Sequence, residues 1–172
     1  MLKPVIACFA LSVLLVAAAA QAPAAPATGD FAGPVDIGGG RKMFLECSGA
    51  CSPTVVLVSG LRGSADDWDI REKPGFTVFP EVAKFTRTCA YDRPGTPVGD
   101  KPSRSDPVRQ PATAADAAAD LHALLAGVLG PYVFVGHSYG GLIARMYAGN
   151  YPDGVTEVSR RCALRHHSDP CR

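Results

Sequence analysis

A short apolar run that ends in a glycine-flanked serine constrains the fold of this chain more than any other feature. Residues 133–135 read Val-Phe-Val, and the next six read Gly-His-Ser-Tyr-Gly-Gly, with Ser138 central in a Gly-x-Ser-x-Gly pattern. The run is typical of a buried strand, and residues 142–148 favour a helix. Gly136 and Gly140 stand where a Cβ atom would meet a neighbouring element in a sharp turn. The pattern predicts a strained strand–turn–helix that presents Ser138; the alternative is a serine that only caps the helix.

The first 27 residues differ in composition from the rest and predict a secretory signal peptide. Lys3 gives a short positive start, residues 5–20 form an apolar block, and small residues follow. Ala25-Pro26-Ala27 is one candidate cleavage site, and residues 18–20 are the other. The block is shorter than the roughly 20 residues of a spanning helix, although an uncleaved anchor is the alternative. We expect a secreted, periplasmic or cell-envelope protein with no stable membrane span after cleavage.

The charge balance gives no indication of nucleic-acid binding. The formal net charge is +1, and no basic stripe precedes the C-terminal residues. A chain of 172 residues with 47% hydrophobic and 19% charged residues fits one globular domain. We expect no nucleic-acid partner, no cofactor and no metal.

Strands and helices alternate along the middle of the chain. Residues 54–58 are continuously apolar, and residues 112–129 are rich in alanine with leucines and a valine on one helical face. This alternation predicts an α/β fold, a mostly parallel sheet with helices on both faces. We expect strands at residues 31–37, 41–47, 54–58, 87–92 and 132–136, and helices at 65–68, 78–85, 112–129 and after Ser138.

From about residue 31 to residue 155 the chain resembles the α/β-hydrolase family. The matching segments are residues 54–60 (Thr-Val-Val-Leu-Val-Ser-Gly), 91–95 (Tyr-Asp-Arg-Pro-Gly) and 136–141, in that order. It is most similar to exported bacterial members of the esterase or peptidase type. The resemblance implies a serine hydrolase that transfers the acyl group of a small-molecule ester or amide to water, with Ser138 as the nucleophile. A serine at this position sets the chain apart from relatives with an aspartate nucleophile, such as epoxide hydrolases and dehalogenases.

The resemblance also implies two backbone N–H donors for the oxyanion of the tetrahedral intermediate. One is the amide of Tyr139, and the other lies in the loop after residues 54–58, at Leu61. The family often has His-Gly where this chain has Ser59-Gly60, a mild departure because the donor is a backbone group.

Three further polar residues, His137, His122 and Asp92, could be proposed as catalytic, but we do not assign them that role. His137 precedes the serine on the strand, so we expect its side chain on the opposite face, as a packed histidine rather than the base. We expect His122, on the long helix, at the surface. Asp92 follows a strand, and we interpret its Asp-Arg-Pro-Gly segment as a structural turn near the site.

The family's sheet order implies a disulfide between Cys47 and Cys89, because it places their strands side by side. The rival pairing is Cys47 with Cys51 across a turn. Export would place these cysteines in an oxidising compartment. The chain after the signal peptide contains five cysteines, and an odd number leaves at least one unpaired.

Residues 156–172 do not continue the family pattern. They contain four arginines, two histidines and two cysteines, and no apolar run that we expect to form a strand. We therefore divide the chain into a signal peptide (1–27), a partial α/β-hydrolase domain (28–155) and a tail that looks foreign to it (156–172). Our hypothesis is that the coding frame is lost near Thr156 or the gene is truncated there. The strand before Ser138 would then form an apolar edge of the sheet.

The composition of this tail leaves two interpretations of function open. The first is a serine hydrolase by ancestry that lacks its acid and base. The second is a catalytically dead remnant that at most binds an apolar ligand or a partner. His166, His167 and Asp169 are a weak substitute for the acid and base, because nothing places them at strand ends. The buried parallel strands disfavour a third interpretation, a small disulfide-stapled binding protein.

Overall fold

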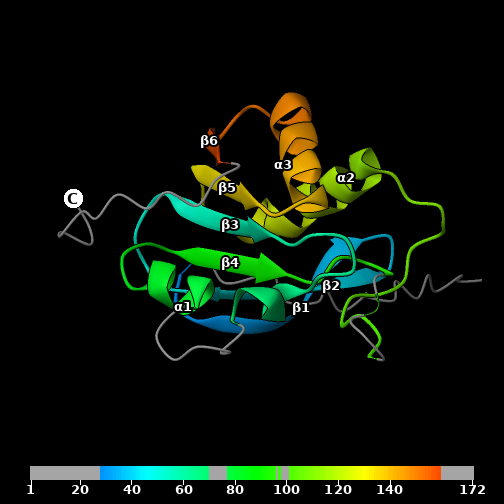
Figure 1. Ribbon diagram of the computed structural model, residues 1–172, viewed down its shortest axis with the longest axis horizontal. Helices are drawn as coiled ribbons and strands as arrows, with labels where there is room; N and C mark the ends of the chain where they lie inside the picture. Colours follow the sequence, from blue (N-terminus) through cyan, green and yellow to red (C-terminus); the bar gives the residue numbers. More distant parts are fainter. Residues whose placement is uncertain (1–27, 70–76, 96, 98–100, 160–172) are drawn as a thin grey trace, which may run out of the picture.

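The described residues form one mixed β-sheet with helices on both faces (Figure 1). The computed structural model describes residues 28–69, 77–95, 97 and 101–159. The expected signal peptide and the segment with His166, His167 and Asp169 lie outside them. The strands are β1 Phe31–Gly38, β2 Arg41–Ser48, β3 Thr54–Val58, β4 Thr88–Tyr91, β5 Tyr132–Gly136 and β6 Val155–Ser159. The helices are the 3-10 turns η1 Ala65–Trp68 and η2 Leu125–Gly127, and α1 Val78–Ala83, α2 Ala114–Leu124 and α3 Tyr139–Asn150.

The strand order is β1-β2-β4-β3-β5-β6. The pairs β1–β2 and β2–β4 are antiparallel, and β4–β3, β3–β5 and β5–β6 are parallel. The predicted fold class is confirmed. The carboxyl ends of β3, β4 and β5 meet at one edge, where open α/β sheets place their ligand sites.

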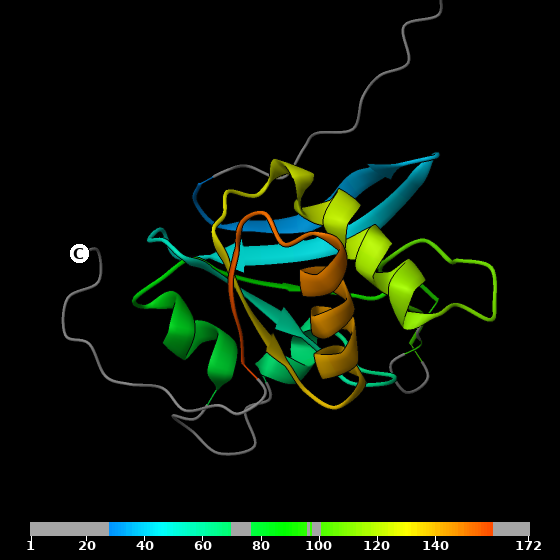
Figure 2. The same ribbon diagram turned by 90° about the horizontal axis from the view of Figure 1, so that it is seen from above.

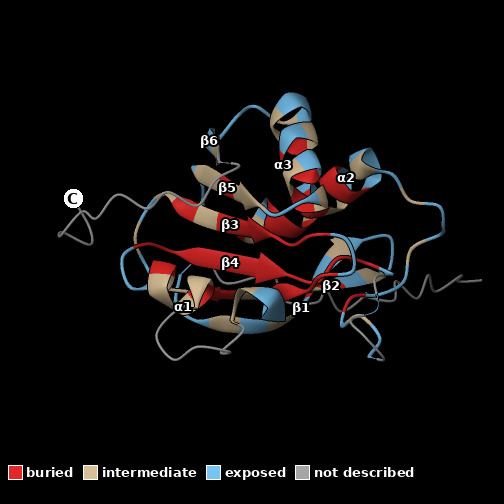
Figure 3. Ribbon diagram, in the orientation of Figure 1, coloured by how far each residue is buried: buried red, intermediate tan, exposed pale blue. Residues whose placement is uncertain are grey.

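Helices cover both faces of the sheet. Helices α2 and α3 pack on one face, and η1 and α1 pack on the other (Figures 1 and 2). The central strands β3 and β4 are almost wholly buried between these layers (Figure 3). Helix α2 begins at the Thr113 cap, whose hydroxyl accepts the N–H of Asp116. The apolar face predicted for this segment is buried; it consists of Leu121, Leu124, Leu125 and Val128.

The predicted disulfide is present. Cys47 and Cys89 are paired residues of β2 and β4, their Cα atoms are 4.1 Å apart, and the two sulfur atoms are bonded. Both residues are buried. The rival pairing of Cys47 with Cys51 is therefore wrong.

Strand β6 corrects the expectation that no strand follows residue 155. Val155–Ser159 runs parallel to β5, with Phe134 opposite Val158. Val155 and Val158 pack against the core while Thr156 and Glu157 are exposed. In this outer strand only the residues directed to the core are apolar, and the backbone pairs with β5. In the described sheet β5 is therefore an interior strand. The division that we predicted between the domain and the tail, at residues 155 and 156, falls inside β6.

Candidate active site

Ser138 occupies a strained turn between β5 and α3. Its φ and ψ are 53° and −120°, a region that costs a residue with a side chain roughly 1–3 kcal/mol. The side chain is exposed and makes no capping hydrogen bond to α3. The predicted strand, turn and helix are thus present; Ser138 is the N-cap residue of α3, but its side chain does not cap the helix. We call residues 136–140 the elbow turn.

The two glycines of the elbow turn are required by close backbone contacts. A Cβ atom on Gly140 would collide with the carbonyl oxygen of Val58 and lie 2.7 Å from that of Ser59. A Cβ atom on Gly136 would lie 2.5 Å from the Cα atom of Gly141. The helix can therefore start directly against the end of β3 only because these positions lack side chains.

Two backbone amides beside Ser138 make no hydrogen bond within the described residues. Tyr139 is the first residue of α3, and the next two amides, of Gly140 and Gly141, donate to the carbonyls of His137 and Ser138 at 2.8 and 3.0 Å. The Tyr139 N–H has no such acceptor among the described residues. The same holds for the N–H of Leu61 in the loop after β3.

The loop after β3 lies directly against the elbow turn. An ideal Cβ atom on Gly60 would stand 3.4 Å from the Cβ of Ser138 and 2.9 Å from Nδ1 of His137. Leu61, the next residue, is 71% exposed. Tyr139 and Leu61 both line a cavity of about 220 Å³, together with Arg62, Arg93 and residues from the loop and first turns of α2. Tyr139 and Leu61 thus share one cavity, while Ser138 is not among its lining residues and lies against Gly60.

The two described histidines have different surroundings, and neither hydrogen-bonds Ser138 within the described residues. His122 is exposed, as expected, and its ring stacks on Tyr151 with centroids 3.8 Å apart. The expectation of a packed His137 is wrong, because its side chain is exposed beside Gly60. Strand β5 ends at Gly136, so His137 belongs to the turn and strand alternation does not govern it.

Asp92 is structural, as the sequence suggested. Its buried carboxylate accepts Nε and Nη2 of Arg104 at 2.6 and 2.8 Å, and the Ala65 N–H at 3.0 Å. Burial by itself raises the pKa of Asp92, but these hydrogen bonds outweigh it, so the pKa lies below its ordinary value. Asp92 thereby fixes the start of η1 just after the loop that carries Leu61.

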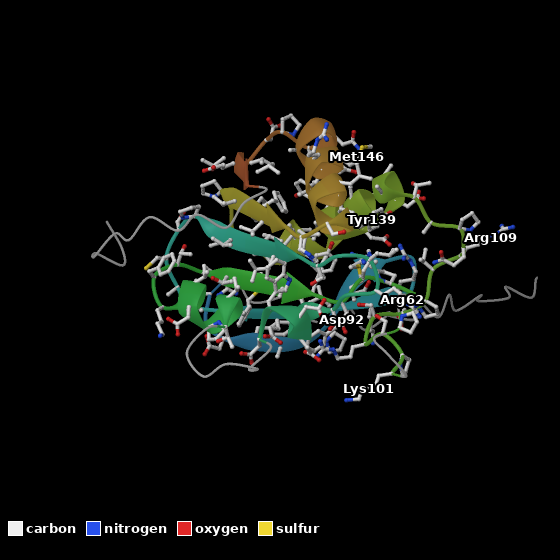
Figure 4. All side chains as sticks on the ribbon, in the orientation of Figure 1. Arg62, Asp92, Lys101, Arg109, Tyr139 and Met146 are labelled. Atoms are coloured by element: carbon white, nitrogen blue, oxygen red, sulfur yellow. A yellow bond between two sulfur atoms is a disulfide. The ribbon has the colours of Figure 1, made fainter. Side chains whose placement is uncertain are left out.

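Sequence reasoning missed two arginines at this edge of the sheet. Arg93 is buried and donates to the carbonyls of Ser59 and Gly60, and Arg104 holds Asp92. Figure 4 shows Tyr139, Arg62 and Asp92 at this same end of the molecule. The Asp-Arg-Pro-Gly motif could have pointed to Arg93, but Arg104 lies in an irregular charged loop that carries no periodic signal.

The described residues contain no group of three or more His, Cys, Asp or Glu that could hold a metal ion. Within the same residues, no helix has the length and apolar content needed to cross a membrane.

A protein-family model described as the alpha/beta hydrolase family matches residues 55–165. The chain is also similar to RutD of Escherichia coli O1:K1, whose name describes it as a proposed carbamate hydrolase. The two are 38% identical over 108 residues, which are 62% of this chain and 36% of RutD. The chain spans between 35% and 43% of the length of the curated relatives it matches.

Two solved structures share the fold. An alpha/beta hydrolase from Novosphingobium aromaticivorans has a TM-score of 0.59 at 23% identity, over 76% of this chain and 43% of the other. A thermophilic esterase from Thermogutta terrifontis has a TM-score of 0.56 at 21% identity, over 76% of this chain and 44% of the other.

Proposed function

This chain belongs to the α/β-hydrolase family, and we propose that it is a serine hydrolase in which Ser138 attacks the carbonyl carbon of an ester or amide. The observation that carries the proposal is the backbone of Ser138. Ser138 is exposed at the carboxyl end of the partly buried strand β5 and has a φ of 53°. Such strain is typical of a turn that holds a nucleophilic hydroxyl clear of the sheet.

The proposed oxyanion hole consists of the N–H groups of Tyr139 and Leu61. Attack on a carbonyl places a negative charge on its oxygen, and preorganised N–H donors stabilise that charge. Both amides are unused within the described residues, and both residues line the cavity beside the elbow turn. Tyr139 adds the positive end of the α3 dipole.

The proposed substrate is a small ester, amide or carbamate. The cavity of about 220 Å³ that Tyr139 and Leu61 line has room for a short acyl group. The name of RutD adds carbamates, whose carbonyl lies between an oxygen and a nitrogen. An assay series should therefore pair a p-nitrophenyl acetate with the corresponding carbamate.

A second candidate is a non-catalytic product that at most binds a ligand or a partner. It is favoured by one observation: within the described residues neither His122 nor His137 hydrogen-bonds Ser138, so no histidine there is in place as a general base for the hydroxyl. Without a base a serine is a weak nucleophile.

A fluorophosphonate probe distinguishes the two candidates, because it modifies only a serine that an active site has activated. Incubation of the full chain with the probe, followed by peptide mass spectrometry, should find the label on Ser138 and none in Ser138→Ala. Ser48→Ala, at the end of β2, is the matched control and should be labelled like the wild type. A folded wild-type protein that remains unlabelled would favour the non-catalytic candidate.

We also propose that the protein is exported. The apolar block after Lys3 supports this, as does a disulfide within the sheet, a bond that persists in oxidising compartments. N-terminal sequencing of the protein from the periplasm or medium should show cleavage after Ala27 or Ala20. A chain found only in the cytosol with its N-terminus intact would refute export.

A further inference from the structure

Arg93 binds two consecutive backbone carbonyls of the loop that carries Leu61. It follows β4 and is only 7% exposed. Its Nη1 donates to the carbonyl oxygen of Ser59 at 3.0 Å, and its Nη2 donates to that of Gly60 at 2.5 Å. A guanidinium can do this because its N–H groups form a rigid planar fork that stays charged.

Because the peptide group is planar, the contact of Arg93 with the Gly60 carbonyl also sets the direction of the Leu61 N–H. The peptide between Gly60 and Leu61 is trans, so its C=O and N–H point in opposite directions. The Gly60 carbonyl is held by Arg93 and also by the Gly63 N–H at 3.1 Å. The Leu61 N–H must therefore point away from Arg93.

Within the described residues, two groups bind the Gly60 carbonyl: the Arg93 guanidinium and the backbone N–H of Gly63. Leu61 is 71% exposed, so burial does not anchor it. Arg62 is exposed too and has a φ of 62°, a conformation that a residue with a side chain rarely adopts. Within the described residues, Arg93 is the only side chain that hydrogen-bonds the Gly60 carbonyl.

The same guanidinium touches the residue that supplies the other donor. Its Cζ lies 5.3 Å from the centroid of the Tyr139 ring, a cation–π distance. One side chain thus contacts both segments of the proposed oxyanion hole, the loop after β3 and the start of α3.

We propose that Arg93 is a positioning residue that sets the direction of the Leu61 N–H and its separation from the Tyr139 N–H. The inference rests on the proposed function, because it assigns these amides to an oxyanion. Arg93 does not contact the reacting atoms; it acts through the Ser59 and Gly60 carbonyls.

The test compares Arg93→Met and Arg93→Lys with a matched arginine at the other end of β4. Arg87 is also buried, and its Nη1 also lies near two backbone carbonyls, those of Gly29 at 2.8 Å and Gly49 at 3.3 Å. Arg87→Met should therefore disturb folding to a similar degree without touching the site. The readouts on the full chain are the second-order rate of Ser138 modification by a fluorophosphonate and the melting temperature.

We expect Arg93→Met to react roughly 10- to 100-fold more slowly than Arg87→Met, since loss of a whole oxyanion donor costs about 10²- to 10³-fold. Arg93→Lys keeps the charge but not the fork, and should recover only part of the rate. Equal rates for Arg93→Met and Arg87→Met, or full recovery with lysine, would overturn the proposal.

A crystal structure of Arg93→Met tests the positioning role without relying on the reactivity of Ser138, because it shows the orientation of the Gly60–Leu61 peptide directly. If the wild type is not labelled, the proposed function fails, and the orientation of the Gly60–Leu61 peptide decides the positioning role. A rotated peptide supports that role. A Gly60 carbonyl that stays in place without the arginine refutes it.

Discussion

Replacing Arg104 with methionine should destabilise the protein strongly and make its stability depend on acid pH. The methionine retains a flexible stem over the ring of Phe44, which the guanidinium covers at 3.7 Å, but it removes the charge. Asp92, whose side chain is 4% exposed, would lose its two shortest hydrogen bonds and keep those from two backbone N–H groups.

The size of the effect follows from the burial of the two partners. Breaking a buried ion pair by removing one partner costs about 3–5 kcal/mol. Arg104 is 38% exposed and water already competes for it, so we expect about 2–3 kcal/mol at pH 7. For a chain of this size that is a fall in Tm of roughly 4–12 °C.

The pH dependence has opposite signs in the two proteins. In the wild type the pKa of Asp92 is depressed, so its stabilisation is complete above the unfolded pKa of about 3.9 and is lost as the pH falls through the lower folded value. In Arg104→Met the two side-chain hydrogen bonds that offset burial are gone, so we expect the pKa of Asp92 to rise above the unfolded value. That carboxylate then destabilises the fold at neutral pH, and the penalty disappears as it protonates. The stability difference should therefore shrink as the pH falls from 7 to 4.

Urea denaturation at pH 7, 5 and 4, followed by circular dichroism, measures this difference. Lys84→Met is the control, because Lys84 and Glu81 form an exposed ion pair that should contribute less than about 0.5 kcal/mol. A constant difference between pH 7 and 4, or one no larger than that of the control, would show that Arg104 does not offset the burial of the Asp92 carboxylate.

Three further predictions concern the elbow turn, the disulfide and the α2 cap. Gly140→Ala should lose about 3 kcal/mol in urea denaturation because its methyl group meets backbone carbonyls, whereas Gly149→Ala, in open space on the same helix, should gain about 0.5–1 kcal/mol; equal effects would contradict the close contact. The double variant Cys47→Ala/Cys89→Ala should lose about 4 kcal/mol, the loop-closure value for a separation of 42 residues, with a larger m-value. An unchanged denaturation curve would argue against this disulfide. Thr113→Ala should lower stability by about 1 kcal/mol in the same assay, and an unchanged stability would show that the Thr113 cap does not stabilise α2.

The sequence predicted the elements whose pattern is local. The run at β3, the amphipathic face of α2 and the glycines of the elbow turn each follow from a short-range rule, and each is present. The end of the long helix was less well predicted, since η2 tightens its last turn at residues 125–127. Within the site, the positions of Ser138 and Tyr139 followed from the same local pattern.

The missed features depend on partners far away in the chain. Strand β6 has only two valines directed to the core, and it forms because β5 offers a row of hydrogen-bonding groups. The exposure of His137 depends on where β5 ends rather than on its alternation. Arg104 gains its role from Asp92, twelve residues earlier, across an irregular loop. No periodic signal encodes such contacts, so only the folded structure reveals them.

Two consecutive residues after β4 link the sheet to the site. Asp92 accepts the Ala65 N–H at one end of the loop after β3, and Arg93 holds the carbonyls of Ser59 and Gly60 at the other end. Because β4 is buried on both faces, this turn has little freedom to move. The loop is thus fixed at its two ends by opposite charges that directly follow a buried strand, while Leu61 in its middle lines the cavity. That arrangement accounts for a buried aspartate and a buried arginine side by side directly after β4, since each is satisfied by groups of the loop that it holds.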